Sequence, residues 1–187
     1  MCGGACAEYA CAPEGRFVLK PANLTFEQAA AVPTSAFAAL HGLRDAGKVR
    51  SGQKVLINGA AGGVGTFAVQ IAKSFGAEVT GVCSAKNVDM VRSIGADHVI
   101  DYTQEDFTQS GRSYDLILDN VANRSFSDCR RALTPRGTLI PNSAHAGMGY
   151  IVKAFVRSAF VRQQGRPFVS TPNNEDLVVL KELIEAG

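Results

Sequence analysis

The chain has 187 residues, of which 46% are hydrophobic and 19% charged, as in an ordinary globular protein of one domain or of one domain and part of another. Its 19 basic and 17 acidic residues are scattered and leave a net charge of +2, which argues against nucleic acid as a main partner. No apolar run is long enough to span a membrane, and residues 1–9 lack the basic and apolar regions of a signal peptide, so we expect a cytoplasmic protein.

The first part of the chain is predicted to contain two helices. Thr25 followed by Gln28 resembles a capping box and predicts a helix that begins at Phe26. Pro33 is expected to end this helix, and a second helix is expected over 35–46. The segments before them could be short extended pieces, at 5–12 and 17–19.

The stretch 54–65, KVLINGAAGGVG, organises the rest of the chain. Its residues 55–57 are apolar and mostly β-branched, which predicts a buried parallel strand. After the glycines, residues 66–75 have helical spacing. The stripe expected to be buried is Phe67, Ile71 and Phe75. A strand, a glycine turn and a helix are the context in which a dinucleotide fingerprint is meaningful.

In this turn, Gly62 and Gly65 occupy the second and third glycine positions of G-x-G-x-x-G, and Ala60 stands in the first. Glycine at the second position lets backbone N–H groups approach a pyrophosphate, and glycine at the third lets the helix pack on the strand. The helix dipole then favours the phosphates. Because this fingerprint is weak by itself, a glycine-rich turn that binds no nucleotide is the alternative.

The remaining sequence alternates strands with helices. Strands are expected at 78–83, 98–102, 114–118 and 137–141, and 167–170 could be a sixth. Helices are expected at 86–94, 125–133, 150–162 and 174–186, with one helical turn at 104–107. This alternation predicts an α/β Rossmann fold: a doubly wound parallel sheet in the order 3-2-1-4-5-6, with helices on both faces. The ligand crevice is expected at the carboxyl ends of the first and fourth strands.

The cysteines raise the question of a metal site. Of the five cysteines, Cys2, Cys6 and Cys11 lie close together in sequence. Their spacing contains no C-x-x-C pair and no fourth ligand follows nearby, so free thiols are the better interpretation than zinc ligands. The three histidines are isolated and form no ligand pair.

Four segments together resemble the medium-chain dehydrogenase/reductase superfamily. Residues 20–33 (KPANLTFEQAAAVP) are similar to the segment that leads into its cofactor domain. Residues 59–65 (GAAGGVG), 95–102 (GADHVIDY) and 114–115 reinforce the resemblance, which covers nearly the whole chain. The similarity is greatest to the zinc-free, quinone-oxidoreductase-like branch.

The resemblance implies two domains, a GroES-like catalytic domain and a Rossmann cofactor domain. We therefore expect residues 1–32 to be a remnant of the first domain with its linker, and residues 33–187 to be the NAD(P)-binding domain, truncated at its C-terminus. Zinc-binding members carry a cysteine ligand near the position of Pro33 and Thr34, and this chain has none there. It also lacks the four-cysteine structural zinc lobe, so no zinc is expected.

The end of the second strand bears on the choice of cofactor. NAD-specific sites usually place Asp or Glu there to bind the ribose 2′-OH, whereas residues 81–86 (GVCSAK) contain no carboxylate. Ser84 can donate a hydrogen bond to a 2′-phosphate, and Lys86 can supply charge. In the related reductases a tyrosine like Tyr102 also reaches this phosphate. NADPH is therefore the expected cofactor; the alternative is that Lys86 is only an exposed residue at a helix start.

Further contacts are implied by the resemblance, position by position. Thr34 corresponds to a residue beside the nicotinamide, Asn120 and Val121 to residues along the ribose and nicotinamide, and Asn142 and Ser143 to residues near the carboxamide. The phosphates are expected against Ala61, Gly62, Gly63 and Val64. Each of these residues could instead be ordinary loop chemistry.

The expected function is that of an NADPH-dependent oxidoreductase that transfers hydride to a quinone or to an enone or alkenal. No catalytic residue is identified, and the chain alone is expected to bind NADPH weakly with little or no reductase activity. The alternatives are a non-catalytic NAD(P)-binding module or redox sensor, a zinc-free alcohol dehydrogenase-like enzyme, and a methyltransferase-like Rossmann protein. The expected partners are a small-molecule substrate and a second copy of the chain, paired through the sheet edge near 167–170.

Overall fold

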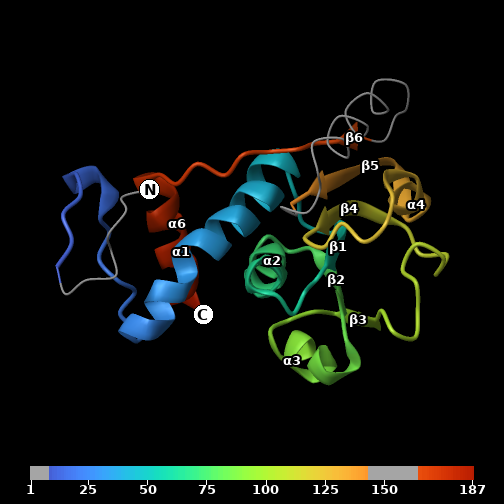
Figure 1. The fold of residues 1–187 in the computed structure, drawn as a ribbon, viewed down its shortest axis with the longest axis horizontal. Coiled ribbons are helices and arrows are strands. Elements are labelled where there is room, and N and C mark those ends of the chain that lie inside the picture. Colours follow the sequence, from blue (N-terminus) through green and yellow to red (C-terminus); the bar gives the residue numbers. More distant parts are fainter. Residues whose placement is uncertain (1–8, 143–163) are drawn as a thin grey trace. The chain divides into compact units, whose positions relative to one another are not determined.

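The computed structural model describes residues 9–142 and 164–187. The chain divides into two compact units (Figure 1). One unit comprises Met1–Phe37 and Thr171–Gly187, and the other comprises Ala38–Ser170.

The unit Ala38–Ser170 is built on a parallel sheet. Its strands are β1 (Lys54–Asn58), β2 (Glu78–Cys83), β3 (His98–Asp101), β4 (Tyr114–Asp119), β5 (Leu133–Pro141) and β6 (Gln164–Gly165). They pair in the order β3-β2-β1-β4-β5-β6, which can be followed from bottom to top in Figure 1. The expected α/β fold and its order 3-2-1-4-5 are confirmed.

The sixth position holds only the two residues of β6, paired with Thr138 and Leu139 of β5. The strand predicted over 167–170 is wrong, because no strand is present there. The last backbone hydrogen bond to β5 is donated by Arg166 to the carbonyl of Leu139. Pro167 follows and has no N–H to donate, so the ladder ends.

The central strands are buried on both faces of the sheet. In β1, Val55, Leu56 and Ile57 are fully buried, and β4 contributes the equally apolar run 116–118. Continuous β-branched and leucine runs are what a strand covered on both faces requires. The core is therefore centred on β1 and β4, and it extends to residues of β2, β3, β5 and α4 (Phe126–Arg131).

Within its described residues, this unit contains the helices η2 (His41–Ala46), α2 (Gly63–Ser74), η3 (Ala85–Asn87), α3 (Val88–Ser93) and α4 (Phe126–Arg131). The helix predicted over 66–75 is α2, and it begins three residues earlier, within the glycine turn. Its buried face is made of small residues, mainly Ala68, Val69 and Ala72, with Ile71. The predicted stripe is wrong at Phe67 and Phe75, which are only half-buried, because small residues bring α2 close to β1 and β2.

Three other predicted elements differ in detail. The helix predicted over 86–94 is split into the 3-10 turn η3 and the short α3, and β5 begins at Leu133 rather than 137. The helical turn predicted over 104–107 is absent. There the carboxylate of Asp106 accepts hydrogen bonds from the backbone N–H (2.9 Å) and hydroxyl (2.8 Å) of Thr108. Such local side-chain bonds compete with helix formation.

The unit formed by the two chain ends contains η1 (Glu14–Arg16), most of α1 (Phe26–Leu40) and α6 (Asn174–Ala186). The capping box is confirmed: the N–H of Thr25 donates to the Gln28 amide oxygen (2.9 Å), and the N–H of Gln28 donates to the Thr25 hydroxyl (3.2 Å). The predicted break at Pro33 is wrong, since α1 continues to Leu40 with Pro33 inside it. Pro33 is exposed, and on the solvent side a helix tolerates a missing hydrogen bond by bending.

Helix α6 has the predicted bounds. Its first turn is capped by Asn173, whose amide oxygen accepts the Asp176 N–H at 2.8 Å. Asn23 donates to the carbonyl of Ile184 (2.7 Å), which ties the segment before α1 to the end of α6. Residues 9–12 and 17–19 form no strand. The helix predicted over 150–162 lies outside the described residues.

No helix in the described part of the chain is both long and apolar enough to cross a bilayer.

Candidate functional site

A cavity of about 680 Å³ opens at the carboxyl edge of the sheet in the unit Ala38–Ser170. It is lined by the residues that end or follow β1, β2, β3, β4 and β5, together with the first turn of α2. This is where an open α/β sheet binds ligands, and the volume is within the range of small-molecule sites.

The turn between β1 and α2 forms the floor of this cavity. Gly59 has a left-handed backbone (φ +80°), and the N–H groups of Gly59 and Ala60 both donate to the carbonyl of Val82, at 3.1 and 2.9 Å. The sharp reversal therefore falls on Gly59, one residue before the first position of the fingerprint, which holds Ala60. This explains why Ala60 is tolerated there.

Gly62 and Gly65 meet different surroundings. A Cβ on Gly65 would lie 2.1 Å from the carbonyl oxygen of Gly59, so the close approach of α2 to the turn requires glycine. A Cβ on Gly62 would make only an ordinary contact of 3.4 Å with the same oxygen. Folding therefore does not demand glycine at position 62, whereas a ligand backed against this turn would.

The N-terminus of α2 carries no side-chain cap. Its N-cap is Gly62, and no side chain accepts a hydrogen bond there, whereas α4 is closed by the capping box of Ser125 and Asp128. The first N–H groups of a helix have no acceptor within the helix. At α2 these belong to the cavity residues Gly63, Val64 and Gly65. Free N–H groups at a dipole's positive end form a site for an anion.

No acidic residue is among those that line the cavity corner after β2. Ser84 and Tyr102 line it, and Tyr102 is 53% exposed. The amide nitrogen of Asn87 donates to the Ser84 hydroxyl oxygen at 3.2 Å, which leaves the hydroxyl hydrogen of Ser84 for another acceptor. Burial, followed by the carboxylate of Asp101, raises the pKa of the Cys83 thiol in the same wall, so this thiol is not a nucleophile.

The chain is similar to known proteins in sequence and in fold. Residues 63–159 match the family described as zinc-binding dehydrogenase. The chain is 33% identical to the chloroplast envelope quinone oxidoreductase homolog of Arabidopsis thaliana, over 99% of this chain and 59% of that protein. It is 34% identical to the 2-methylene-furan-3-one reductase of Solanum lycopersicum, over 98% of this chain and 43% of that protein. A solved NAD-dependent alcohol dehydrogenase superposes with a TM-score of 0.79 and 29% identity, over 98% of this chain and 55% of that one.

The chain belongs to the zinc-binding dehydrogenase family. It is a member of the medium-chain dehydrogenase/reductase superfamily, as its sequence motifs indicated. The chain spans about half the length of these relatives.

In this family member the predicted site residues are mostly brought together. The cavity is lined by Ala61, Gly62, Gly63, Val64, Ser84, Tyr102, Asn120, Val121 and Asn142. Lys86 is exposed on η3 and does not line the cavity. Thr34 lies on α1 in the other compact unit, and Ser143 lies outside the described residues.

Three asparagines in the cavity wall were missed from the sequence: Asn58, Asn87 and Asn123. Asn58 is a buried polar residue directly after the apolar run of β1, which is a signal that the pattern offered. Asn87 lies in the turn after β2, but nothing in its spacing distinguished it. Asn123 is placed by the loop after β4.

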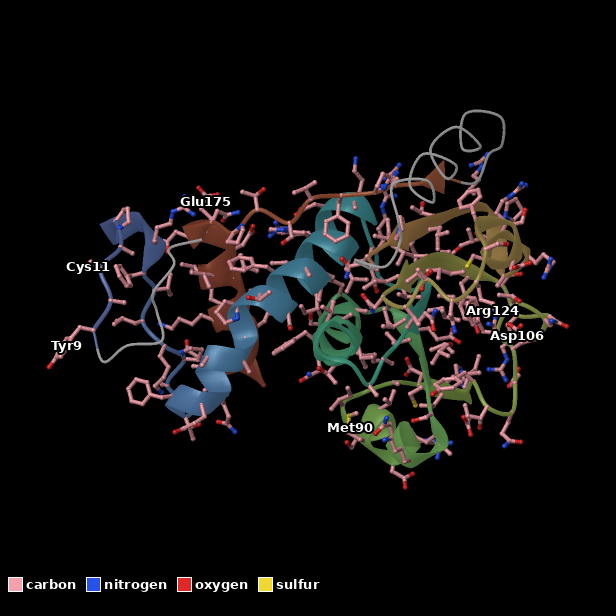
Figure 2. All side chains as sticks on the ribbon, viewed as in Figure 1. Tyr9, Cys11, Met90, Asp106, Arg124 and Glu175 are labelled. Atoms are coloured by element: carbon pink, nitrogen blue, oxygen red, sulfur yellow. The ribbon has the colours of Figure 1, made fainter. Side chains whose placement is uncertain are left out.

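The loop after β4, which contains Asn123, is stabilised by an ion pair. The guanidinium Nε of Arg124 lies 3.2 Å from the carboxylate of Asp106, and Figure 2 shows the two residues side by side. Burial acts to raise the pKa of Asp106, but hydrogen bonds from Thr108 and the Arg124 charge outweigh it and hold the pKa below its usual value. Asp106 is therefore ionised at neutral pH, and the pair fixes the residue that follows Asn123.

The described residues include no group of three or more His, Cys, Asp or Glu side chains that could hold a metal ion. Within them, Cys11 is exposed while Cys83 and Cys129 are buried, and all three are free. Cys2 and Cys6 lie outside the described residues.

Proposed function

We propose that this chain binds NADPH in the cavity and serves an oxidoreductase that reduces a quinone or the conjugated double bond of an unsaturated carbonyl compound. The names of two relatives, a quinone oxidoreductase homolog and a 2-methylene-furan-3-one reductase, support this substrate class. The nicotinamide would supply the hydride. This chain would bind the dinucleotide, orient its ring and exclude water.

The observation that carries the proposal is the uncapped N-terminus of α2 facing the cavity. The N–H groups of Gly63, Val64 and Gly65 would hold the pyrophosphate, with Gly62 leaving space for it. Ala61 lies beside them in the cavity wall. Asn120, Val121 and Asn142, from the opposite wall, would hold the ribose and nicotinamide.

The preference for NADPH over NADH rests on the corner after β2. No carboxylate ends this strand, and the Ser84 hydroxyl and the Tyr102 ring border the space where a 2′-phosphate would lie. The flexible side chain of Lys86, on the adjoining turn, would supply a positive charge. The solved NAD-dependent alcohol dehydrogenase that resembles this chain favours the alternative, a zinc-free alcohol dehydrogenase-like enzyme that uses NADH.

We also propose a division of labour within the protein. Residues 1–32 would belong with a GroES-like catalytic domain, and residues 33–187, including Thr34 and Ser143, would form the cofactor domain. The acceptor would bind where the two domains meet. Zinc takes no part in the proposed chemistry, since the position of the family's cysteine ligand holds Pro33 and Thr34.

A homodimer is proposed through the outer edge of β6. Thr138 and Leu139 of β5 pair with one side of this strand. An outer sheet edge offers backbone donors and acceptors to a second copy.

Calorimetric titration with NADPH and NADH tests the function. NADPH is expected to bind about tenfold or more tightly, because a charge-assisted phosphate contact contributes roughly 1.5–3 kcal/mol. Lys86→Gln should weaken NADPH by a similar factor and leave NADH unchanged. Lys54→Gln is the matched control, since Lys54 begins β1 at the opposite end of the strand. Equal affinities would contradict the NADPH preference, and binding of neither dinucleotide would contradict the function.

A further inference from the structure

A buried carboxylate, Asp119, ends β4 directly before the cavity residues Asn120 and Val121. Its side chain is completely buried. Oxygen Oδ1 accepts three hydrogen bonds: from the Asn58 amide (2.8 Å), from the N–H of Val121 (3.2 Å) and from the N–H of Ala122 (2.9 Å). Within the described residues, Oδ2 has no partner. A buried carboxylate with an unused oxygen is costly, so its retention calls for a reason.

The carboxylate determines how Asn58 is oriented. Since Asp119 Oδ1 only receives hydrogen bonds here, Asn58 has to present its NH₂ group to it. The same NH₂ group donates to the Asn123 amide oxygen at 3.1 Å. The amide oxygen of Asn123 is therefore used by Asn58, and its amide nitrogen is left to donate to another group.

A second branch begins at the backbone carbonyl of Asn58, which is also only an acceptor. The Asn120 amide nitrogen donates to it at 3.1 Å, so the Asn120 amide oxygen faces the other way. That oxygen accepts from the amide nitrogen of Asn142 at 2.8 Å, and the Asn142 N–H donates to the Asp119 carbonyl at 2.9 Å. Two groups that can only accept, Asp119 Oδ1 and the Asn58 carbonyl oxygen, therefore determine the orientation of all four asparagine amides. The amide oxygen of Asn142 is therefore left to accept a hydrogen bond from another group.

We propose that Asp119 is a positioning residue for the nicotinamide half of the dinucleotide. It acts on the asparagine relay, which consists of Asn58, Asn120, Asn123 and Asn142, by orienting Asn58 and, through it, Asn123; the Asn58 carbonyl orients Asn120 and Asn142. The relay leaves an acceptor at Asn142 and a donor at Asn123, two cavity residues, and a carboxamide with its ribose hydroxyls needs both kinds of group. This inference rests on the proposed function.

The same carboxylate also places the apolar wall of the site. By binding the N–H groups of Val121 and Ala122 it stabilises the turn in which Ala122 has a left-handed backbone (φ +58°). A left-handed alanine is strained unless its surroundings enforce it. This turn brings a methyl group of Val121 so close to Gly59 that a Cβ on Gly59 would meet it at 2.8 Å.

Four variants and two ligands test the proposal. Asp119→Leu removes the acceptor and is expected to weaken NADPH about tenfold or more, because the amides of Asn58 and Asn123 then lose the group that orients them. Adenosine 2′,5′-bisphosphate lacks the nicotinamide half, so its affinity should change less than about twofold. Asp119→Asn retains an Oδ1 acceptor and is expected to retain most of the NADPH affinity. Asp115→Leu is the control: Asp115 also lies on β4 but binds the Lys54 N–H (3.0 Å) and the Thr134 hydroxyl (3.2 Å).

Equal weakening of both ligands in Asp119→Leu, or NADPH binding equal to that of Asp115→Leu, would overturn the proposal and leave Asp119 a structural residue. If Asp119→Leu does not fold, Asn123→Leu decides, since it removes the donor that Asp119 orients through Asn58, at an exposed position and without adding charge. Normal NADPH affinity in folded Asn123→Leu would overturn the proposal, and selective loss would support it. Wild-type protein that binds neither NADPH nor NADH would refute the proposed function itself, before any variant is made.

Discussion

Gly62 and Gly65 lie three residues apart in one turn, but folding requires glycine only at position 65, whereas the proposed dinucleotide requires it at position 62. Gly65→Ala places a methyl group 2.1 Å from a backbone oxygen, so it should lower the free energy of unfolding by about 2 kcal/mol or more. Gly62→Ala should leave stability within about 0.5 kcal/mol of wild type. It should nevertheless weaken NADPH about tenfold or more, because the methyl group occupies the space of the pyrophosphate. Urea unfolding and calorimetry measure the two effects.

The control for this comparison is Gly15→Ala, where an added Cβ meets nothing within 4 Å. It should change neither stability nor binding. Undiminished NADPH binding by folded Gly62→Ala would mean that the turn is only structural, which is the alternative that the sequence left open.

The buried thiol of Cys129 should make the stability of the folded protein depend on pH in the alkaline range. Burial, and then the nearby Asp119 carboxylate, raises its pKa from 9.0 to about 12. Above pH 9 the unfolded chain loses this proton while the folded protein keeps it, so the free energy of unfolding should fall as pH rises. The stability difference between wild type and Cys129→Ala should therefore shrink between pH 8 and pH 10.5, by at most about 1.4 kcal/mol per pH unit. A constant difference for Cys129→Ala would refute the assignment.

At the scale of elements, helix starts follow local chemistry. In α4 the Ser125 hydroxyl accepts the Asp128 N–H at 3.2 Å, and the Asp128 carboxylate accepts the Ser125 N–H at 3.3 Å. Ser125→Ala should cost about 1 kcal/mol in urea unfolding, because one N–H of the first turn loses its acceptor. Ser93→Ala is the control, since that exposed hydroxyl only donates to the Met90 carbonyl at the end of α3. An equal, negligible loss in both variants would contradict the role of the cap.

Sequence patterns predicted the bounds of an element correctly where local residues determine its ends, and failed where other parts of the chain determine them. The bounds of β2 and α6 agree with the prediction, and at α6 the start is determined by a local cap, Asn173. Pro33 was expected to end a helix, but α1 continues through it, since a proline on the exposed side breaks only one hydrogen bond. The start of β5 at Leu133 depends on pairing with Tyr114, which the intervening sequence does not encode.

At the scale of the whole molecule, sheet topology predicted much of the candidate site. Parallel strands carry their carboxyl ends to one edge, so Ser84, Tyr102, Asn120 and Asn142 were expected to lie near the glycine turn, and they do. Topology does not specify where a long side chain rests, which is why Lys86 was expected at the cavity and lies outside its wall. Nor does it show hydrogen-bond direction, so the roles of Asp119 and the asparagine relay required the structure.

Dinucleotide binding should also stabilise the unit Ala38–Ser170 as a whole, because the cavity is built only from its residues. A ligand at 100 times its dissociation constant adds about 2.7 kcal/mol if it binds only the folded state. For a protein of this size, that raises the midpoint of thermal unfolding by roughly 5–10 °C. At equal concentrations NADPH should therefore give a larger rise than NADH, measured by circular dichroism. Gly62→Ala should have the same midpoint as wild type without ligand and a much smaller rise with NADPH; the same rise in both proteins would show that the dinucleotide binds elsewhere.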